Sequence, residues 1–298
     1  MKHFFVSIPL ILLMSCGPTE QPHVDLVSQQ WIHGSVDCGS NSDPAIQVVQ
    51  YNRDTWILRQ NKCTNAEAPF MFLFLGEARA LLMDTGATDD PAIFPLYETI
   101  STILSEWNAG RAEPVTLVVA HTHKHGDHYA ADGQFVGKDN VSLVGLEVAD
   151  IQAYFGIRQW PEEMVDFDLG ERTVQIIPIP GHEEASIALY DESTGWLLTG
   201  DTFYPGRLYV KDWMAFKSSI ARLVEFSHNN KIEYILGNHI EMSSTPGRDY
   251  KMGTLYQPNE LPLPLTIADL EELHMELEQL GDIPARAVRD KFIIYPLE

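Results

Sequence analysis

Short apolar segments alternate with amphipathic ones along most of the chain, and this alternation predicts an α/β fold. Apolar or β-branched segments bounded by glycine, proline or charged positions are typical of strands. The predicted strands are residues 46–50, 55–59, 70–75, 80–83, 115–120, 174–179, 186–190, 195–198 and 234–236. Two consecutive pairs, 70–75 with 80–83 and 186–190 with 195–198, are close enough in sequence to form hairpins.

Three further segments have the apolar spacing of amphipathic helices. They are residues 91–107, 214–226 and 267–280. In the first, Ile93, Leu96 and Ile100 fall on one face. The third runs up to Gly281, a residue that commonly follows a helix end.

The N-terminal residues have the features of a secretory signal. Lys2 precedes an apolar run over residues 4–14, which is too short to be a comfortable transmembrane span. The run ends in Leu13-Met14-Ser15-Cys16, which resembles the lipobox of bacterial lipoproteins, where the cysteine becomes the lipidated first residue. The alternative is an ordinary signal peptide that happens to contain a cysteine.

These features predict how the chain is organised and where it resides. We expect a lipoprotein signal peptide over residues 1–15, a tether over 16–30 and one folded catalytic domain over 31–298. Such a protein would be held at a membrane of the cell envelope by a lipid on Cys16. Cys38 and Cys63, the other two cysteines, should form a disulfide in that oxidising compartment.

Charge narrows the range of partners. The chain has 20 Lys and Arg against 42 Asp and Glu, a formal net charge of −22. Such a surface repels phosphate backbones, so we expect no nucleic-acid partner.

A histidine cluster follows the predicted strand 115–120. His121, His123, His125, Asp127 and His128 lie within eight residues, and so many polar groups cannot all be satisfied by ordinary core packing. Imidazole and carboxylate are ligands that suit zinc, iron and manganese. On an extended turn His123 and His125 point the same way, while Asp127 and His128 can reach a second metal beside the first.

The cluster and four other motifs resemble the metallo-β-lactamase superfamily. The motifs, in chain order, are Leu82-Met83-Asp84-Thr85-Gly86, His123-x-His125-x-Asp127-His128, Pro180-Gly181-His182, Gly200-Asp201-Thr202 and Gly237-Asn238-His239. The similarity covers roughly residues 45–245. It implies a single-domain, four-layer αββα sandwich with the site at one edge of the two sheets.

The resemblance also implies a ligand set for two metal ions, most simply two zinc ions, with iron or manganese as alternatives. The first ion would be held by His123, His125 and His182, and the second by Asp127, His128 and His239, with Asp201 bridging the two. His121 falls just outside the signature and is interpreted as structural, although an exchange of roles with His123 stays open. Asp84 would orient the loop or a ligand histidine.

A mechanism follows from these metals. A water shared by two dications ionises near neutral pH and gives a bridging hydroxide, which would attack an ester-like bond of a small-molecule substrate: a lactone, ester, thioester or amide. Asp127 could orient the hydroxide and pass a proton to the leaving group. Tyr204, three residues beyond Asp201, has the spacing found in acyl-homoserine lactonases, and its phenol could bind a carbonyl oxygen or simply pack.

Other functions of the family stay open. Asp201 argues against a β-lactamase, and residues 257–298, with Arg286, Arg289 and Lys291 as their only fixed cations, lack the basic extension of glyoxalase II-like thioesterases. A single-iron enzyme similar to persulfide dioxygenases and a non-catalytic metal-binding lipoprotein remain alternatives. The aromatic segment 203–216 is expected either to wall an apolar pocket or to begin an amphipathic helix.

Overall fold

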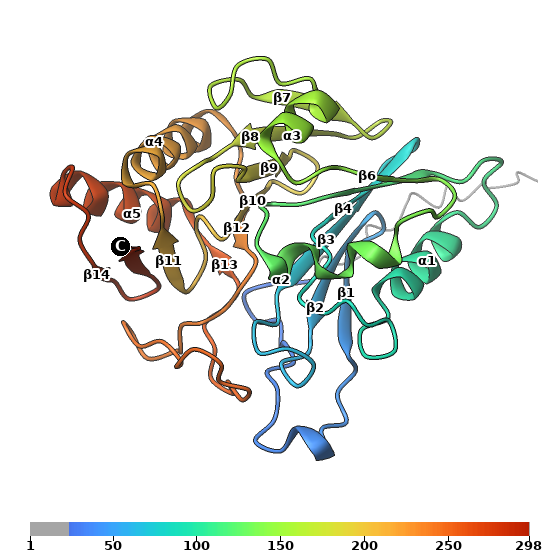
Figure 1. Ribbon diagram of the computed structural model, residues 1–298, viewed down its shortest axis with the longest axis horizontal. Coiled ribbons are helices and arrows are strands. Elements are labelled where there is room, and N and C mark those ends of the chain that lie inside the picture. The colour runs from blue at the N-terminus through green and yellow to red at the C-terminus, as the bar shows by residue number, and fades with distance from the viewer. Residues whose placement is uncertain (1–23, 298) are drawn as a thin grey trace, which may run out of the picture.

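A computed structural model describes residues 24–297, and two six-stranded sheets lie at its centre (Figure 1). The first sheet has the order β1-β2-β3-β4-β5-β6. Its strands are β1 (Ile46–Asn52), β2 (Thr55–Gln60), β3 (Phe70–Leu75), β4 (Arg79–Met83), β5 (Thr116–Ala120) and β6 (Val141–Leu143). Strands β1 to β4 form an antiparallel meander, whereas β4, β5 and β6 are parallel.

The second sheet has the order β13-β12-β10-β9-β8-β7. Its strands are β7 (Val165–Asp168), β8 (Thr173–Pro178), β9 (Ile187–Asp191), β10 (Trp196–Gly200), β12 (Tyr234–Gly237) and β13 (Pro264–Leu265). A small third sheet joins the C-terminal residues to the middle of the chain. It contains β11 (Arg207–Val210), β15 (Ile293–Pro296) and β14 (Ala287–Val288), in that order.

The helices are α1 (Leu96–Trp107), α2 (Gly126–Tyr129), α3 (Val148–Phe155), α4 (Trp213–Asn229) and α5 (Ile267–Leu280). Helices α1, α4 and α5 cover the outer faces of the two large sheets. Helix α2 contains Asp127 and His128, and Ile151 and Phe155 of α3 belong to the core between the sheets. Figure 1 shows α1 to the right of the blue strands of the first sheet, and α4 with α5 on the left. No helix among residues 24–297 is long and apolar enough to cross a bilayer.

Strand β3 shows why the sheets are buried on both faces. Its six residues are all buried, and alternate side chains point to opposite sides of the sheet. Phe72 and Phe74 lie between the sheets, each with its ring edge toward Trp196 of β10. Met71 and Leu73 face the other way and belong to the core under α1. The predicted four-layer αββα fold is confirmed.

Some predicted boundaries were wrong for identifiable reasons. The helix expected from residue 91 begins at Leu96, because a proline disfavours helical backbone at the residue before it and Pro95 follows Phe94. Ile93 therefore lies outside the helix and is half exposed. The elements that the sequence did not predict are short or lack clear periodicity: β6, β7, β11, β13, β14, β15, α2 and α3.

The aromatic segment 203–216 does not begin one helix. Phe203, Tyr204 and Phe216 are buried in the core beneath α4 and α5, where Phe203 contacts Phe292 edge to face. Helix α4 begins only after Asp212, whose side chain accepts a hydrogen bond from the amide of Ala215. These aromatic residues share this core with Leu208 and Val210 of β11 and so support the third sheet.

The predicted disulfide between Cys38 and Cys63 is confirmed, with the two Cα atoms 5.2 Å apart. It ties the segment before β1 to the loop between β2 and β3, and this loop lies at the same sheet edge as the histidine cluster. Cys16 and the predicted signal peptide lie outside the described residues.

Replacing both cysteines with alanine should lower the free energy of unfolding by about 3 kcal/mol, because the disulfide closes a loop between residues 25 positions apart. Urea unfolding with saturating metal measures the change. The wild type in reducing agent should unfold at the same urea concentration as the double variant, which reducing agent should not affect. Equal midpoints for oxidised wild type and double variant would contradict the prediction.

Candidate metal centre

Five strands end at the same edge of the sandwich and place the chemically distinctive residues there. β4 leads into Asp84, β5 into the histidine cluster, β8 into the loop with His182, β10 into Asp201 and β12 into His239. The ends of strands in α/β sheets are where ligands commonly bind. The strands therefore bring together residues that are far apart in the sequence.

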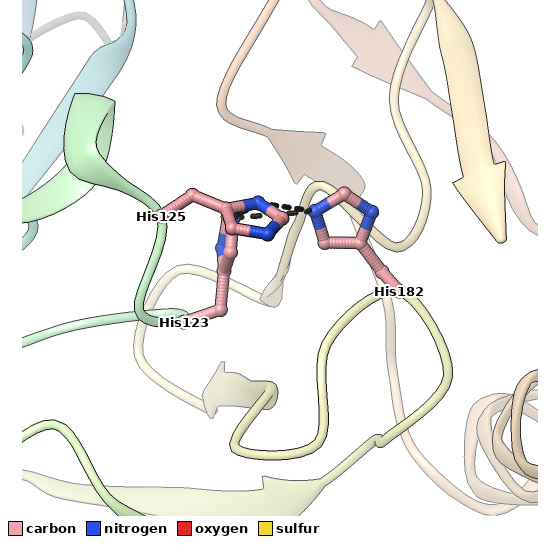
Figure 2. A group of neighbouring side chains, drawn as sticks. All are labelled: His123, His125 and His182. Atoms are coloured by element: carbon pink, nitrogen blue, oxygen red, sulfur yellow. Dashed lines mark hydrogen bonds between the residues drawn. The ribbon is translucent and has the colours of Figure 1, made fainter. Parts of the chain in front are cut away.

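One group contains the three histidines predicted for the first metal (Figure 2). Nδ1 of His125 lies 3.0 Å from Nε2 of His123 and 3.0 Å from Nε2 of His182. The two Nε2 atoms are 3.2 Å apart. Figure 2 shows the rings turned toward one another, two from the loop after β5 and one from the loop after β8.

The tautomer of His182 shows that this group fits a cation. Its Nδ1 lies 2.8 Å from the carbonyl oxygen of Tyr209, so Nδ1 must carry a proton and donate it. In the neutral ring Nε2 then presents a lone pair to the other two imidazoles. Burial lowers the pKa of His182, and burial together with the neighbouring imidazoles lowers that of His123, so neutral rings are favoured.

The second group contains Asp127, His128, Asp201 and His239. Nε2 of His239 lies 3.3 Å from Oδ2 of Asp127 and 3.4 Å from Oδ1 of Asp201. Nε2 of His128 lies 3.5 Å and 3.6 Å from the same two oxygens. Two imidazoles and two carboxylates thus surround one point, a donor set that suits zinc, iron or manganese.

Asp201 lies between the two groups. Its Oδ1 faces His128 and His239, whereas its Oδ2 is 4.0 Å from Nε2 of His182 in the first group. Oδ1 is buried and accepts no hydrogen bond from any residue among 24–297. A buried carboxylate oxygen without a partner is costly, and a metal ion would remove that cost.

The imidazoles and carboxylates of the second group strongly shift one another's pKa values. Burial lowers the pKa of His239, but Asp201 and Asp127 outweigh it and raise the pKa to about 9. Burial raises the pKa of Asp201, but His239 and His128 outweigh it and lower the pKa to about 2. These imidazoles must lose their protons to bind a metal, so metal uptake here should release protons.

Asp84 holds the two histidine-bearing loops in place. Its carboxylate accepts hydrogen bonds from the amide and hydroxyl of Thr122 and from the side chain of Asn238, at 2.8, 2.9 and 2.6 Å. Its Oδ2 also lies 3.3 Å from Nδ1 of His128, so it orients that ring. Asp84 has φ +69°, a left-handed conformation that aspartate tolerates better than most residues.

Other contacts that sequence reasoning missed complete this support. The carbonyl oxygen of Glu67, in the disulfide-linked loop, lies 3.1 Å from Nδ1 of His239. Gly200, with φ +55°, lies so close to Thr122 that a Cβ would sit 2.8 Å from the Cβ of that threonine. The backbone carbonyls carry no sequence signal, but the glycine directly before Asp201 could have indicated a close approach.

His121 lies outside both groups. Its Nε2 is 2.9 Å from Oδ1 of Asp132, which also accepts a hydrogen bond from Thr85. This contact agrees with the structural interpretation of His121 and gives no support to an exchange with His123.

The hydroxyl of Tyr204 also forms its hydrogen bonds within the protein. Its side chain is fully buried, and its hydroxyl lies 2.5 Å from the carbonyl oxygen of Arg207 and 3.0 Å from Oε2 of Glu241. The single hydroxyl proton is therefore used inside the protein. Burial and the carboxylate of Glu241 raise the pKa of Tyr204 well above its usual value. This geometry favours the packing role over a contact with substrate.

The family model of the metallo-β-lactamase superfamily matches residues 65–239. The chain belongs to this superfamily. The matched span includes all seven predicted ligands, so the resemblance inferred from five short motifs is confirmed.

Named relatives of the chain within the superfamily are hydrolases. A hydroxyacylglutathione hydrolase from Gloeothece citriformis is 28% identical over 175 residues, which cover 51% of this chain and 68% of the relative. An acyl-coenzyme A thioesterase from Gallus gallus is 30% identical over 94 residues, which cover 30% of this chain and 33% of the relative. Family and relatives together identify the chain as a metal-dependent hydrolase.

Solved structures agree on the fold. A metallo-β-lactamase from Erythrobacter litoralis has a TM-score of 0.50 at 14% identity and covers 80% of this chain and 99% of its own. A metallo-β-lactamase from Pseudomonas aeruginosa has a TM-score of 0.50 at 15% identity, covering 82% and 99%. At such identities the likeness concerns the fold alone.

Replacing His125 with alanine should remove the first metal. Only two imidazoles, those of His123 and His182, would then remain in this group, and two imidazoles alone hold a metal ion weakly. Replacing His121 with alanine should leave both metals bound. Metal per chain, measured after dialysis against metal-free buffer, tests both variants. Loss of metal from His121→Ala with retention by His125→Ala would reverse the two assignments.

Replacing Asp201 with asparagine should lower turnover by more than about 100-fold. This loss exceeds the largest effects that are typical of residues that only orient a metal ligand. Asparagine keeps the shape but removes the charge that would offset two nearby metal ions, so one metal should be lost preferentially. Metal content and rate are measured on the same sample. Two bound metals and near wild-type turnover would show that Asp201 only shapes the turn after Gly200.

Proposed function

We propose that the chain binds two divalent metal ions, most simply zinc, and hydrolyses a thioester or related ester of a small molecule. The observation that carries this proposal is the position of Asp201, with one oxygen toward each ligand group and Oδ1 otherwise unpartnered. In this proposal His123, His125 and His182 hold one ion, and Asp127, His128 and His239 hold the other.

Two bound divalent ions would lower the pKa of a shared water to near 7 and polarise the substrate carbonyl. The protein's own contribution is positioning. Tyr209 and Glu67 fix the tautomers of His182 and His239 through their backbone carbonyls, and Asp84 orients His128. Asp127, the less buried of the two carboxylates, would accept a proton from the water and donate it to the leaving group.

The structure and the relatives together change the ranking of substrates. The lactonase hypothesis was based on the ligand set and on the spacing of Tyr204, and the hydroxyl of Tyr204 is bound to Arg207 and Glu241. From the sequence alone, thioesters are a weaker candidate because residues 257–298 contain few cations. However, two relatives are named as hydrolases of acylglutathione and of acyl-coenzyme A, both of which are thioesters. A thioester is therefore the first candidate, and the β-lactam is not supported by any feature of the site.

We also propose that the protein acts in the cell envelope, anchored by a lipid on Cys16. The disulfide between Cys38 and Cys63 supports this location, because such bonds persist in oxidising compartments and are rare in the cytosol. A tether between Cys16 and the domain would be short, because Leu26 is already buried in the core.

The purified protein should hydrolyse at least one thioester in a panel that also contains lactones, β-lactams, simple esters and phosphodiesters. Metal content is measured on the same sample, and His125→Ala is the inactive control. Two zinc ions per chain with thioester cleavage supports the proposal. One iron per chain with oxygen consumption on a persulfide would replace it with a dioxygenase, and stable metal binding without turnover of any substrate would leave a metal-binding protein.

A further inference from the structure

The charges around the metal centre suggest which substrates can approach it. The segments that carry the ligands or contact their rings are residues 65–68, 84–86, 121–128, 180–186, 200–204, 207–211 and 237–241. Apart from the two ligand aspartates, their carboxylates are Glu67, Asp84, Glu183, Glu184 and Glu241. Their lysines and arginines are Lys124, Arg207 and Lys211. The availability of these three cations decides whether an anionic substrate could be bound.

Lys124, between two ligand histidines, is held by carboxylates. Its Nζ lies 2.7 Å from Glu147, 2.8 Å from Glu184 and 3.7 Å from Glu183. Its charge is more than balanced by its three neighbours. Lys211 is exposed, and it is outnumbered by the exposed carboxylates Glu67, Glu147 and Glu184.

The guanidinium of Arg207 is also paired with carboxylates. Its guanidinium donates to Glu241 and to Asp249, the latter at 2.7 Å, and also to the hydroxyl of Tyr209 at 2.9 Å. All of these partners are within the protein, and the side chain is nine-tenths buried. Arg207 therefore supports the loop after His239 and has no donor directed to a substrate anion.

Two more cations lie close by but face inward. Arg59 is completely buried and makes a two-pronged ion pair with Glu260, both distances being 2.6 Å. Lys62, in the loop that carries Glu67, is buried and donates to the carbonyl oxygen of Ala66. Glu67 itself is exposed, with its backbone carbonyl against His239. At the surface of this loop the charge is therefore negative.

We infer that the enzyme selects substrates whose carrier group is uncharged or cationic, and discriminates against thioesters of polyanionic carriers such as coenzyme A. The inference rests on the proposed hydrolase function. The exposed carboxylates Glu67, Glu147 and Glu184 form a rim beside the ligand loops, and apart from the exposed Lys211 the nearby cations are paired or buried. In physiological salt the Debye length is about 8 Å, so this rim acts on a carrier group that lies beside it. A carrier with several phosphates would meet repulsion that Lys211 alone does not offset.

The test compares three thioesters of one acyl group: the cationic thiocholine, the neutral N-acetylcysteamine and the anionic coenzyme A derivative. At low salt, kcat/KM should be about tenfold or more lower for the coenzyme A ester than for the neutral ester. In about 1 M NaCl, where the Debye length is about 3 Å, the gap should narrow several-fold. A coenzyme A ester that is preferred, or a gap that does not respond to salt, would overturn the inference.

Two variants locate the effect. Glu147→Gln and Glu184→Gln each remove an exposed rim carboxylate that pairs with Lys124, and each should raise kcat/KM for the coenzyme A ester a few-fold while leaving the neutral ester nearly unchanged. Glu192→Gln is the matched control, because Glu192 is exposed in the turn between β9 and β10, at the opposite sheet edge. Equal gains in the control would show that net charge, and not the rim, is responsible.

Metal removal provides a readout that does not need turnover. The anionic chelator dipicolinate should strip metal faster as salt increases, whereas the neutral chelator 1,10-phenanthroline should show little change. If no thioester is cleaved, the proposed function fails, and the chelators still decide whether the rim repels anions. Dipicolinate removal that slows or stays constant with salt would overturn the charge inference on its own.

Discussion

Nitrogen and oxygen atoms with lone pairs converge at one edge of the sandwich, and this convergence constrains the rest of the molecule. The nitrogen atoms of three imidazoles approach within 3.2 Å, and Oδ1 of Asp201, a buried carboxylate oxygen, accepts no hydrogen bond from residues 24–297. Burying such groups without partners costs free energy, so a chain that gathers them needs cations and a rigid support. Bound metal would provide the positive charge, and the sheets provide the rigidity.

The support is distributed over segments that are distant in sequence. Asp84 joins the ends of β4, β5 and β12 through Thr122 and Asn238, and the carbonyls of Glu67 and Tyr209 each fix one histidine ring. The Tyr209 carbonyl belongs to β11, which pairs with the C-terminal strand β15. The loop with Glu67 is connected to residue 38 by the disulfide. Both ends of the domain therefore contribute to the geometry of the site.

The same supports explain the charge around the centre. Arginine and lysine side chains near the ligand loops form ion pairs that hold those loops, as Arg207 does with Glu241 and Asp249, and Arg59 does with Glu260. A cation used in this way is not available to recognise an anionic ligand. Structural pairing and substrate selection are thus linked, because both draw on a small number of positive charges in a chain with a net charge of −22.

The sequence alone determined the fold class and predicted which residues gather at the edge of the sandwich. Apolar periodicity reports burial directly, and the motifs around His123, His182, Asp201 and His239 place metal-binding side chains after strand ends, where α/β proteins put their sites. The short elements β6, β11 and β13 to β15 were not predictable, because their pairing is decided by neighbours far along the chain.

Only the tertiary structure decided what surrounds the ligands. Backbone carbonyls that fix the histidine rings have no side-chain signature, so Glu67 and Tyr209 could not be found from residue types. Tyr204 has a suggestive spacing after Asp201, but the direction of its hydroxyl depends on Arg207 and Glu241, which other segments bring to it. Likewise, a count of charges gives the net value, whereas the pairing of each cation follows from distances that only the folded chain defines.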